Sequence, residues 1–428
     1  MIIYFSVKNF RSFKNESSIN FTSVSKIRKM SEHEVKIGSI SILKNIGIFG
    51  SNAYGKSNIL SALSFMVNLV TKNVFTDNLA FIDSIDEPTT FEIAFITSNR
   101  EKYDYYFSIK KGNIVNPYII IDEALYRLKD SGQNELIYSK DSGLKNVDSE
   151  ALKYFEAGYK ATDGQLFLRY INAPERYDES SKTSILLRKI FNYFLTDILV
   201  MVDNKSSFLP INKQNIEHAT KYLKRYDVGI EDVKFINLSQ EEISNVIAEP
   251  IFEMIKQEFI SKRVNEQYIS NGKEIYSISI KDNDYVFQKL VFKHKHIDTL
   301  FSYGYESVGT QRLFALLSIL FDENNFNRTI AIDEIERSAF PNITSNVIED
   351  FQEEYSKEMT QLVFTSHLTS LLDEVLRKDE VYFVDKNYFG ESTIYPLSKF
   401  KPETREIVSK EFLSGSYGAV PKIGVKLD

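Results

Sequence analysis

The chain contains no cysteine and no tryptophan, and only five of its 428 residues are histidine. Without cysteine it can hold neither a disulfide nor a cysteine-based zinc site, and it is compatible with a reducing compartment. The first residues lack the charged-then-apolar layout of a signal peptide, and no apolar run approaches the roughly 20 residues that span a bilayer. These absences predict a cytoplasmic protein with no membrane association.

The charge balance gives no overall sign of a nucleic-acid-binding protein. The net charge is −7, although a local basic patch would be compatible with it. The length exceeds one typical compact core, so we expect a main domain and a second element. We interpret the 25 tyrosines and 32 phenylalanines as a compositional bias and not as a binding box.

What the sequence does contain is a complete phosphate-binding loop. Residues 50–58 read Gly-Ser-Asn-Ala-Tyr-Gly-Lys-Ser-Asn and match the pattern GxxxxGK[ST]. An apolar strand is predicted before the loop, over residues 46–49, and apolar residues at helical spacing follow it. This context distinguishes the motif from a chance glycine-rich turn.

Each part of the loop has a physical task. Gly50 and Gly55 permit turns that a Cβ would obstruct, and the loop amides can surround a phosphate chain at the positive end of a helix. Lys56 is expected to reach the β- and γ-phosphates, and Ser57 to place its hydroxyl on Mg²⁺. The predicted nucleotide-binding set is Gly50, Ser51, Asn52, Ala53, Tyr54, Gly55, Lys56, Ser57 and Asn58.

Periodicity divides the rest of the chain into strand-rich and helix-rich parts. Alternating or apolar runs predict strands over 2–8, 17–22, 90–97, 103–109, 118–121, 268–280 and 285–292. Helical spacing occurs over 184–199, 211–226 and 238–259; the last has Ser239 and Glu242 at capping-box spacing and Pro250 at an expected kink. We therefore predict an N-terminal half of the main domain over 1–125, a largely helical insertion over 126–284, and a C-terminal half over 285–428. Sustained heptads are absent, which argues against a coiled-coil arm.

A second motif opens a predicted helix. Residues 306–312 read Glu-Ser-Val-Gly-Thr-Gln-Arg, and apolar residues at helical spacing follow. A serine and a glycine at a helix N-terminus can form another anion site, here through Ser307 and Gly309. The alternative is that Ser307 is a simple helix cap, and the motif alone does not decide between the two.

Two predicted buried strands end in polar side chains. Residues 329–332 lead into Asp333, which is expected to hold Mg²⁺, and Glu334, which is expected to polarise the attacking water. Residues 362–366 lead into His367, which is expected to sense the γ-phosphate. A solvated acidic pair and a structural histidine are the alternatives.

The order of these motifs resembles that of ABC-type ATPases: phosphate loop, Ser-x-Gly signature, Asp-Glu strand and switch histidine. The segments 9–13 (Asn-Phe-Arg-Ser-Phe), 50–58, 306–313, 333–338 and 365–367 resemble the OLD-like and SMC/RecF-like branch. Within it, the chain resembles the stand-alone AAA-type ATPases of phage-defence (abortive-infection) systems, and residues 412–421 also favour that family. The resemblance implies an α/β fold: an ABC-ATPase head, with a mixed sheet around the phosphate loop, an antiparallel β subdomain and a helical insertion.

The resemblance also implies how the site is completed. ATP and Mg²⁺ would be bound in a head-to-tail homodimer, where Ser307 and Gly309 of one subunit cap the γ-phosphate held by Lys56 of the other. Glu334, His367 and Lys56 would be the catalytic residues, and Ser57 and Asp333 the magnesium ligands. Arg11 lies where related ATPases have a nucleotide-sensing arginine.

The sequence departs from the family pattern at two places, and one family residue is not identifiable. Val308 stands where transporter-type signatures have a second glycine, and Phe340 stands where the family usually has a histidine. The glutamine of the family's Gln-loop is not identifiable, and Glu92 is a candidate for that role only by its position on a strand.

The favoured function is a soluble defence ATPase that controls a toxic effector. Relatives of the OLD type carry a TOPRIM nuclease after the switch histidine, and residues 368–428 are too short for one. A separate effector of nuclease or TOPRIM type is therefore expected, with a phage protein or a nucleic acid as trigger and a dimer or higher oligomer as the assembly.

Two other functions were weighed against it. A RecF- or SMC-like DNA-maintenance ATPase shares the head motifs, although the net charge of −7 and the absent coiled coil weigh against it. A transporter subunit fits least, because of the large insertion. GTP specificity is disfavoured because no Asn-Lys-x-Asp motif occurs.

Overall fold

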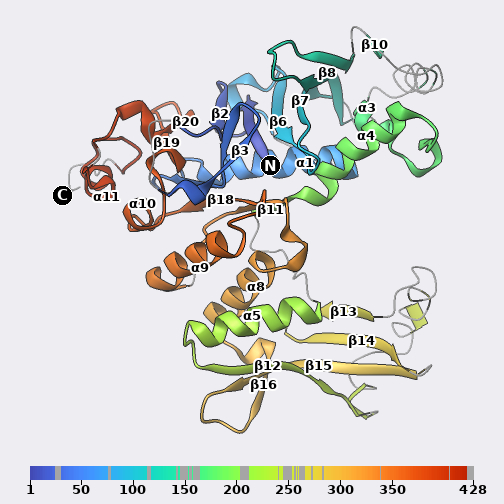
Figure 1. Cartoon of the computed structure of the whole chain (residues 1–428), viewed down its shortest axis with the longest axis vertical. Coiled ribbons are helices and arrows are strands. Elements are labelled where there is room, and N and C mark those ends of the chain that lie inside the picture. The colour runs from blue at the N-terminus through green and yellow to red at the C-terminus, as the bar shows by residue number, and fades with distance from the viewer. Residues whose placement is uncertain are drawn as a thin grey trace. The chain divides into compact units, whose positions relative to one another are not determined.

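The chain folds into two compact units (Figure 1). The computed structural model describes residues 1–24, 30–75, 79–112, 117–140, 143–144, 153, 157, 164–202, 212–239, 241–243, 253–254, 257, 259, 266–270, 273–281, 284–337, 339–403 and 405–421. We call the first unit the head unit; it comprises Met1–Asp203, Asn325–Glu336 and Ile348–Asp428. The second, the inserted unit, comprises Asn204–Asn324 and Arg337–Val347.

A six-stranded, mostly parallel sheet forms the centre of the head unit. Its order is β11 (Ile198–Met201), β17 (Thr329–Ile332), β18 (Gln361–Ser366), β5 (Asn45–Phe49), β19 (Val381–Lys386) and β20 (Ser392–Pro396). Only β20 runs antiparallel to its neighbour. The strands β5, β17 and β18 are buried throughout, as is usual for parallel strands covered on both faces. Their carboxyl ends lie at one edge, because Ser366 pairs with Phe49 and Phe364 with Ile332.

A seven-stranded antiparallel sheet forms the second layer of the head unit. Its order is β10 (Gly143–Leu144), β9 (Glu135–Ser139), β8 (Tyr118–Leu128), β7 (Lys102–Lys111), β6 (Thr89–Ile96), β1 (Ile2–Lys8) and β2 (Ser17–Asn20). Helix α1 (Lys56–Lys72) packs its apolar face on this sheet, where Phe65 stacks on Phe91 with 5.4 Å between ring centroids. The core is thus continuous from α1 to both sheets.

The remaining helices and strands of the head unit are short. They are β3 (Glu34–Ile37), β4 (Ile40–Leu43), α3 (Phe167–Ile171), α4 (Lys182–Asn192), the π-helix η4 (Tyr193–Asp197), α10 (Leu371–Glu374) and α11 (Val408–Leu413). Helix α9 (Pro341–Glu354) begins in residues of the inserted unit and ends in the head unit. The 3₁₀ turns described in the two units together are η1 (Ser31–His33), η2 (Ile82–Ser84), η3 (Pro174–Arg176), η5 (Tyr303–Tyr305), η6 (Glu323–Asn325), η7 (Lys378–Glu380) and η8 (Leu397–Phe400).

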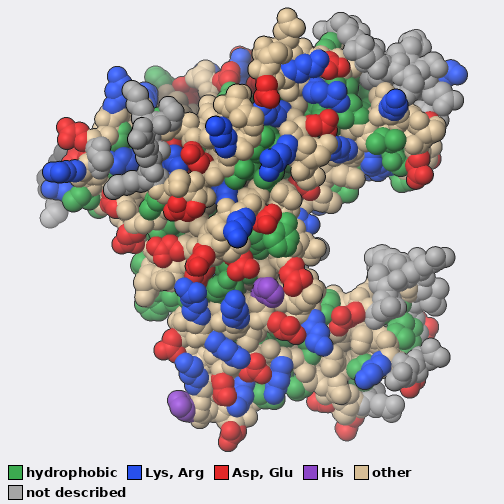
Figure 2. Space-filling model, in the orientation of Figure 1, with side chains coloured by type: hydrophobic (Ala, Val, Ile, Leu, Met, Phe, Trp, Pro, Cys, Tyr) green, Lys and Arg blue, Asp and Glu red, His purple; other side chains and the backbone are tan. Residues whose placement is uncertain are grey.

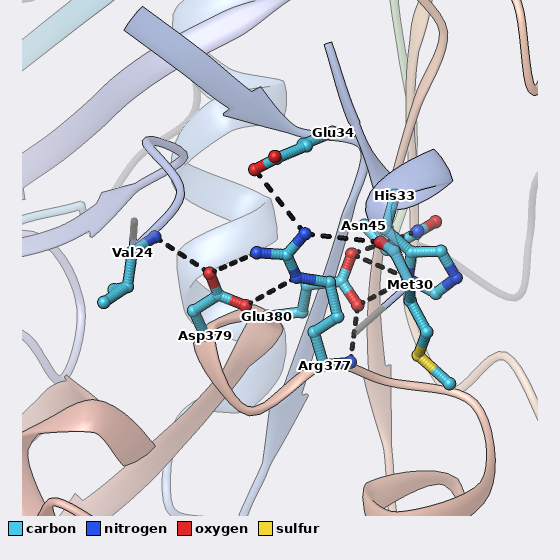
Figure 3. Close-up of polar contacts among 8 residues, drawn as sticks. All are labelled: Val24, Met30, His33, Glu34, Asn45, Arg377, Asp379 and Glu380. Atoms are coloured by element: carbon cyan, nitrogen blue, oxygen red, sulfur yellow. Dashed lines mark hydrogen bonds and ion pairs between the residues drawn. The ribbon is translucent and has the colours of Figure 1, made fainter. Parts of the chain in front are cut away.

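A buried ionic network holds the β3–β4 hairpin against the start of β19 (Figure 3). The guanidinium of Arg377 donates two hydrogen bonds to the carboxylate of Asp379, at 3.0 and 2.9 Å, and lies 3.5 Å from Glu34. The carboxylate of Glu380 lies 2.9 Å from Nδ1 of His33 and accepts a hydrogen bond from Asn45, the first residue of β5. The network therefore fixes the amino-terminal end of the parallel sheet, opposite the edge where the sequence motifs end.

The inserted unit is built on an antiparallel sheet. Its strands are ordered β12 (Ile230–Asn237), β15 (Asp284–His294), β14 (Ile275–Lys281) and β13 (Glu266–Ser270), and β16 (Leu300–Ser302) also pairs with β15. Helices α5 (Lys213–Arg225) and α8 (Val308–Leu320) lie on one face of this sheet (Figure 1). Tyr222 of α5 stacks on Phe321 with 3.7 Å between the ring centroids. Phe314 of α8 contacts Phe292 of β15 with 5.3 Å between the ring centroids.

The predicted mixed sheet around the phosphate loop and the predicted antiparallel β subdomain are both present in the head unit. The expected helix over 184–199 is wrong at its end, because Ile198–Met201 forms β11 and pairs with β17. Tyr193 and Phe194 lie in the π-helix η4 and pack on Phe95, and at Ile198 sheet pairing overrides the helical spacing.

The insertion also differs from the predicted one. The boundaries expected at 125 and 285 do not coincide with the division between units, because residues 126–203 belong to the head unit. The described part of the inserted unit carries a sheet as well as helices, and its strands β13, β14 and β15 lie where strands were predicted over 268–280 and 285–292. The predicted helix over 238–259, with Pro250, lies mostly outside the described residues, but the expected capping contacts between Ser239 and Glu242 are present.

Candidate functional site

The phosphate loop connects the carboxyl end of β5 to the amino end of α1. Gly50 has a φ of 149°, and a Cβ there would clash with the carbonyl oxygen of Val384. Gly55 has a φ of 106°, and a Cβ there would lie 2.7 Å from the hydroxyl oxygens of Ser12 and Ser392. Both glycines are therefore required by the backbone geometry of the loop and by the close approach of neighbouring segments.

The side chain of Lys56 lies inside the loop. Its ammonium group donates hydrogen bonds to the carbonyl oxygens of Gly50, at 2.8 Å, and Ser51, at 3.1 Å. Burial lowers the pKa of Lys56 to about 8, against the opposing effect of Asp333, Glu336 and Glu334. Lys56 is thus a buried cation near three carboxylates, and it remains largely protonated at neutral pH.

The acidic pair after β17 is oriented by Thr365 of β18. The Thr365 hydroxyl donates to Oδ1 of Asp333 at 2.6 Å and accepts from the amide of Glu334 at 2.8 Å. Glu334 has a φ of +50°, an uncommon conformation for this residue that is costly unless neighbouring groups hold it in place. One buried hydroxyl therefore positions both predicted acids.

His367 follows β18 and faces the same groups. Its backbone amide donates to Oε1 of Glu336 at 2.6 Å. Burial and the charge of Lys56 lower the pKa of His367 below its usual 6.5, although Glu336, Glu334 and Asp333 oppose this. The imidazole is therefore neutral at pH 7, with one ring nitrogen able to donate and the other to accept a hydrogen bond.

These groups come from distant parts of the sequence but converge at one edge of the sheet. Lys56, Asp333, Glu334 and His367 follow β5, β17 and β18, and the electrostatic coupling among them reflects their proximity. Ligands of open α/β sheets bind at this edge, outside the carboxyl ends of the strands. Glu336 belongs to the same cluster and was not singled out from the sequence, since only its position after the acidic pair would have suggested it.

Arg11 lies beside the first turn of α1. Its Nη1 lies 3.4 Å from Oδ1 of Asn58, and its φ of +49° places it in a strained turn. The side-chain Nδ2 of Asn58 also donates to the hydroxyl of Ser12 at 2.7 Å. Ser57, between Lys56 and Asn58 in the same turn, is half-buried.

Residues from the last third of the chain support the phosphate loop, and sequence reasoning did not assign them. The amide of Ser51 donates to the carbonyl of Ala419 at 2.9 Å, and the hydroxyl of Tyr54 donates to the carbonyl of Val420 at 3.2 Å. Most of these contacts use backbone atoms, which leave no trace in residue type. The only available signal was the resemblance of residues 412–421 to the defence-ATPase family.

The signature motif lies in the inserted unit. Ser307 is the N-cap of α8, and its hydroxyl accepts a hydrogen bond from the amide of Thr310 at 3.1 Å. The preceding Glu306 lies 2.8 Å from Nε2 of His294, and the following Val308 is 68% exposed. The capping role is therefore present, and Ser307 and Val308 are exposed at the start of the helix, next to the half-buried Gly309.

Glu92, the Gln-loop candidate, belongs to a different group of residues. It lies on β6, where its carboxylate accepts a hydrogen bond from Ser6 of β1 at 3.5 Å. Burial and the charge of Glu16 raise its pKa. These contacts give no support for a role next to Lys56.

Comparison with known proteins identifies the family. The family described as "AAA domain, putative AbiEii toxin, Type IV TA system" matches residues 46–373, more than half of the chain. The chain belongs to this family. The resemblance seen in the motifs, to AAA-type ATPases, is thereby confirmed. No curated protein matches the chain.

Solved structures of SMC heads and of RecF are similar to this ATPase at low identity. An SMC head bound to the C-winged helix domain of ScpA is 14% identical, with 94% of this chain and 99% of that chain covered and a TM-score of 0.43. An SMC head domain from Thermotoga maritima is 13% identical, with 92% and 98% covered and a TM-score of 0.37. The recombination mediator RecF with ATP is 15% identical, with 90% and 96% covered and a TM-score of 0.37.

The described surface has a mixed charge. Figure 2 shows Lys and Arg side chains interspersed with Asp and Glu on the face in view. In the inserted unit, Lys293 pairs with Glu231 at 3.0 Å and Lys224 with Asp232 at 3.4 Å. Among the helices that the structure describes, none is long and apolar enough to cross a membrane.

Proposed function

We propose that this ATPase is a dimeric, ATP-dependent switch in anti-phage defence that controls a separate toxic effector. The observation that carries the nucleotide part is the convergence of Lys56, Asp333, Glu334 and His367 at one edge of the sheet. The donor set fits magnesium and a nucleotide triphosphate, because a buried ammonium group lies in a glycine loop opposite paired carboxylates. Bound Mg²⁺ would neutralise charge that develops on the phosphates.

The roles of the residues follow from their chemistry. Lys56 is the phosphate-binding cation, and the loop amides of residues 51–57 with the N-terminus of α1 bind the remaining phosphate oxygens. Ser57 and Asp333 supply oxygen ligands for Mg²⁺. Glu334 acts as the general base that polarises water, and neutral His367 is a hydrogen-bond partner for the γ-phosphate. Arg11, near Asn58, is positioned to sense the bound nucleotide.

The dimer follows from the signature. Ser307 and Gly309 open α8 next to the exposed Val308, with amides and a hydroxyl that suit an anion. The resemblance to ABC-type ATPases supports the idea that they complete the site of a second copy. ATP binding then closes the dimer and hydrolysis releases it.

A substitution of the general base tests the nucleotide roles. Glu334→Gln is expected to bind ATP, to hydrolyse it at least about 100-fold more slowly than wild type, and to accumulate as a dimer in light scattering. Lys56→Ala is expected to lose nucleotide binding and to remain unaffected by ATP. Hydrolysis by Glu334→Gln at the wild-type rate would show that another residue is the base.

Mixing two inactive variants tests the head-to-tail arrangement. Lys56→Ala disables one half of each composite site, and Ser307→Arg disables the other. An equimolar mixture is expected to regain up to one working site in each mixed dimer. If the mixture stays as inactive as its components while each variant folds, the trans arrangement is refuted.

The control of an effector rests on the defence resemblance, and its test is biochemical. A tagged copy expressed with the neighbouring genes is expected to capture a nuclease or TOPRIM protein in an ATP-dependent manner. Protection against phage by the ATPase alone would argue against a separate effector.

The alternative is a RecF- or SMC-like function in DNA repair or maintenance. The shared head motifs favour it, whereas the net charge of −7 weighs against it. ATP-dependent binding to gapped DNA, with a salt dependence that reports several phosphate contacts, would favour this alternative over the defence switch.

A further inference from the structure

Two aromatic side chains at the tip of the β19–β20 hairpin are almost fully exposed. Tyr388 is 98% exposed and Phe389 is 76% exposed. Their rings contact each other edge to face, with centroids 5.8 Å apart and an interplanar angle of 84°. Adjacent large aromatic rings left in water are unusual in a soluble protein and suggest that a ligand or partner covers them.

The turn that presents these rings is well ordered by hydrogen bonds. Oδ1 of Asn387 accepts from the amides of Phe389 and Glu391, both at 3.0 Å, and Nδ2 of Asn387 donates to the Glu391 carboxylate at 2.9 Å. The same carboxylate forms an ion pair of 3.0 Å with Lys14. The backbone that carries the aromatic pair is therefore held in place from both sides of the turn, which reduces the cost of ordering it on binding.

The same hairpin forms one wall of the phosphate loop. Nζ of Lys386 donates to the carbonyl of Ala53 at 3.2 Å, and the hydroxyl of Ser392 donates to the backbone carbonyl of Tyr54 at 2.6 Å. The amide of Ser392 donates to the carbonyl of Ser12 at 2.7 Å. Tyr388 and Phe389 lie between these two anchoring residues in sequence, so the rings are tethered to the loop that would bind the phosphates.

Strand order indicates which end of a nucleotide faces this hairpin. Asp333 and His367 follow β17 and β18, on one side of β5, whereas β19 and β20 lie on the other side. A phosphate chain whose γ end faces Asp333 and His367 therefore extends across the loop toward β19 and β20. The nucleoside, at the opposite end of the chain, would approach the hairpin.

We infer that Tyr388 and Phe389 form a stacking platform for the base of the nucleotide whose phosphates are bound by residues 50–58. The inference rests on the proposed nucleotide site and adds the residues that recognise the base. Stacking a base on an aromatic side chain strengthens binding by about 5- to 150-fold and tolerates any base, because every base has a π-face. The ring pair thus supplies affinity, while the phosphate loop supplies the anion site.

Calorimetric titration of the full chain with ADP and with pyrophosphate, each with Mg²⁺, tests this. Both ligands carry a diphosphate, but only ADP carries a base, and neither has the γ-phosphate that the signature would cap. The double variant Tyr388→Ala/Phe389→Ala is expected to bind ADP about 5- to 150-fold more weakly than wild type and pyrophosphate equally well. Tyr388→Phe keeps the ring and is expected to keep the affinity.

The matched control is Phe326→Ala. Phe326 is 53% exposed and precedes β17, so it lies toward the end of the sheet opposite the phosphate loop, and its removal is expected to leave ADP binding unchanged. Thermal unfolding of each variant checks that removing an exposed ring leaves the fold intact.

Three results would count against the inference. Wild-type ADP affinity in the double variant would overturn it while leaving the phosphate site in place. Unchanged ADP affinity with weaker ATP-driven dimers would assign the rings to a contact with a second copy, which also overturns it. If wild type binds neither ADP nor ATP, the proposed function itself fails.

Discussion

Replacing Thr365 by valine tests how the acidic pair is held. Thr365 is fully buried, and valine has nearly the same shape but no hydroxyl. The substitution removes the donor to Asp333, 2.6 Å away, and the acceptor for the amide of Glu334, 2.8 Å away. The backbone of Glu334, at a φ of +50°, then loses one of the contacts that hold it in its strained conformation.

The size of the effect can be worked out for stability and for chemistry separately. An amide left without a partner in a buried setting costs about 1–3 kcal/mol, whereas the half-buried Asp333 can replace its lost bond with water. The free energy of unfolding should therefore fall by about 1–3 kcal/mol. A general base displaced by about 1 Å loses roughly 100-fold in rate, so hydrolysis should fall much more than stability.

The assay separates positioning from folding and from binding. Urea unfolding gives the stability, single-turnover hydrolysis gives the chemical step, and ADP titration gives the affinity. Because Lys56 and the loop keep their contacts, the dissociation constant for ADP should stay within a few-fold of wild type. Thr365→Ser keeps the hydroxyl and should retain most of the hydrolysis rate.

A folded Thr365→Val protein that hydrolyses ATP as fast as wild type would refute this reasoning. It would mean that the contacts from Thr365 do not position the base. Equal losses in the serine and valine variants would point to packing of the side chain and not to its hydroxyl.

Two further predictions concern Lys56 and the buried network. Because burial lowers the pKa of Lys56 to about 8 and phosphate binding requires its charged form, ADP affinity should be greatest below pH 8. The ADP affinity should fall as the pH rises through 8, approaching about tenfold per pH unit. ADP titrations of wild type at pH 7 to 9, with Lys56→Ala as the baseline, check this. Arg377→Met should cost about 3–5 kcal/mol of unfolding free energy, because it leaves the carboxylate of Asp379 buried and unpaired, and Arg377→Met/Asp379→Leu should recover most of that loss in urea unfolding.

The centre of the fold was predictable because each motif there is tied to a regular element. Residues 46–49, 329–332 and 362–366 are short apolar runs followed by polar side chains, a pattern that predicts buried strands ending at a site. The structure has β5, β17 and β18 at these places, side by side and parallel. Local pattern and strand topology agree there, so Lys56, Asp333 and His367 converge as the motif order implies.

Elsewhere the tertiary context decides. Ile198–Met201 continues a helical spacing, yet it becomes β11 because its backbone groups pair with β17. Glu123 gave no signal of its role either. It is fully buried, and it accepts hydrogen bonds from the hydroxyls of Tyr105 and Tyr138, both at 2.8 Å, and from the amide of Phe167 at 2.7 Å. Partners separated by up to 44 residues cannot be identified from one sequence without knowing the fold.

The arrangement around the phosphate loop suggests why so much of the chain is needed for one site. The side of the loop that faces Asp333, Glu334 and His367 comes from strands after residue 325, whereas the other side is formed by residues 11–14 and the β19–β20 hairpin. A nucleotide that bridges both sides would link segments that otherwise meet only through the sheet. Ligand binding that joins them would stabilise the head unit by mass action, so wild type should gain thermal stability with ADP and Lys56→Ala should not.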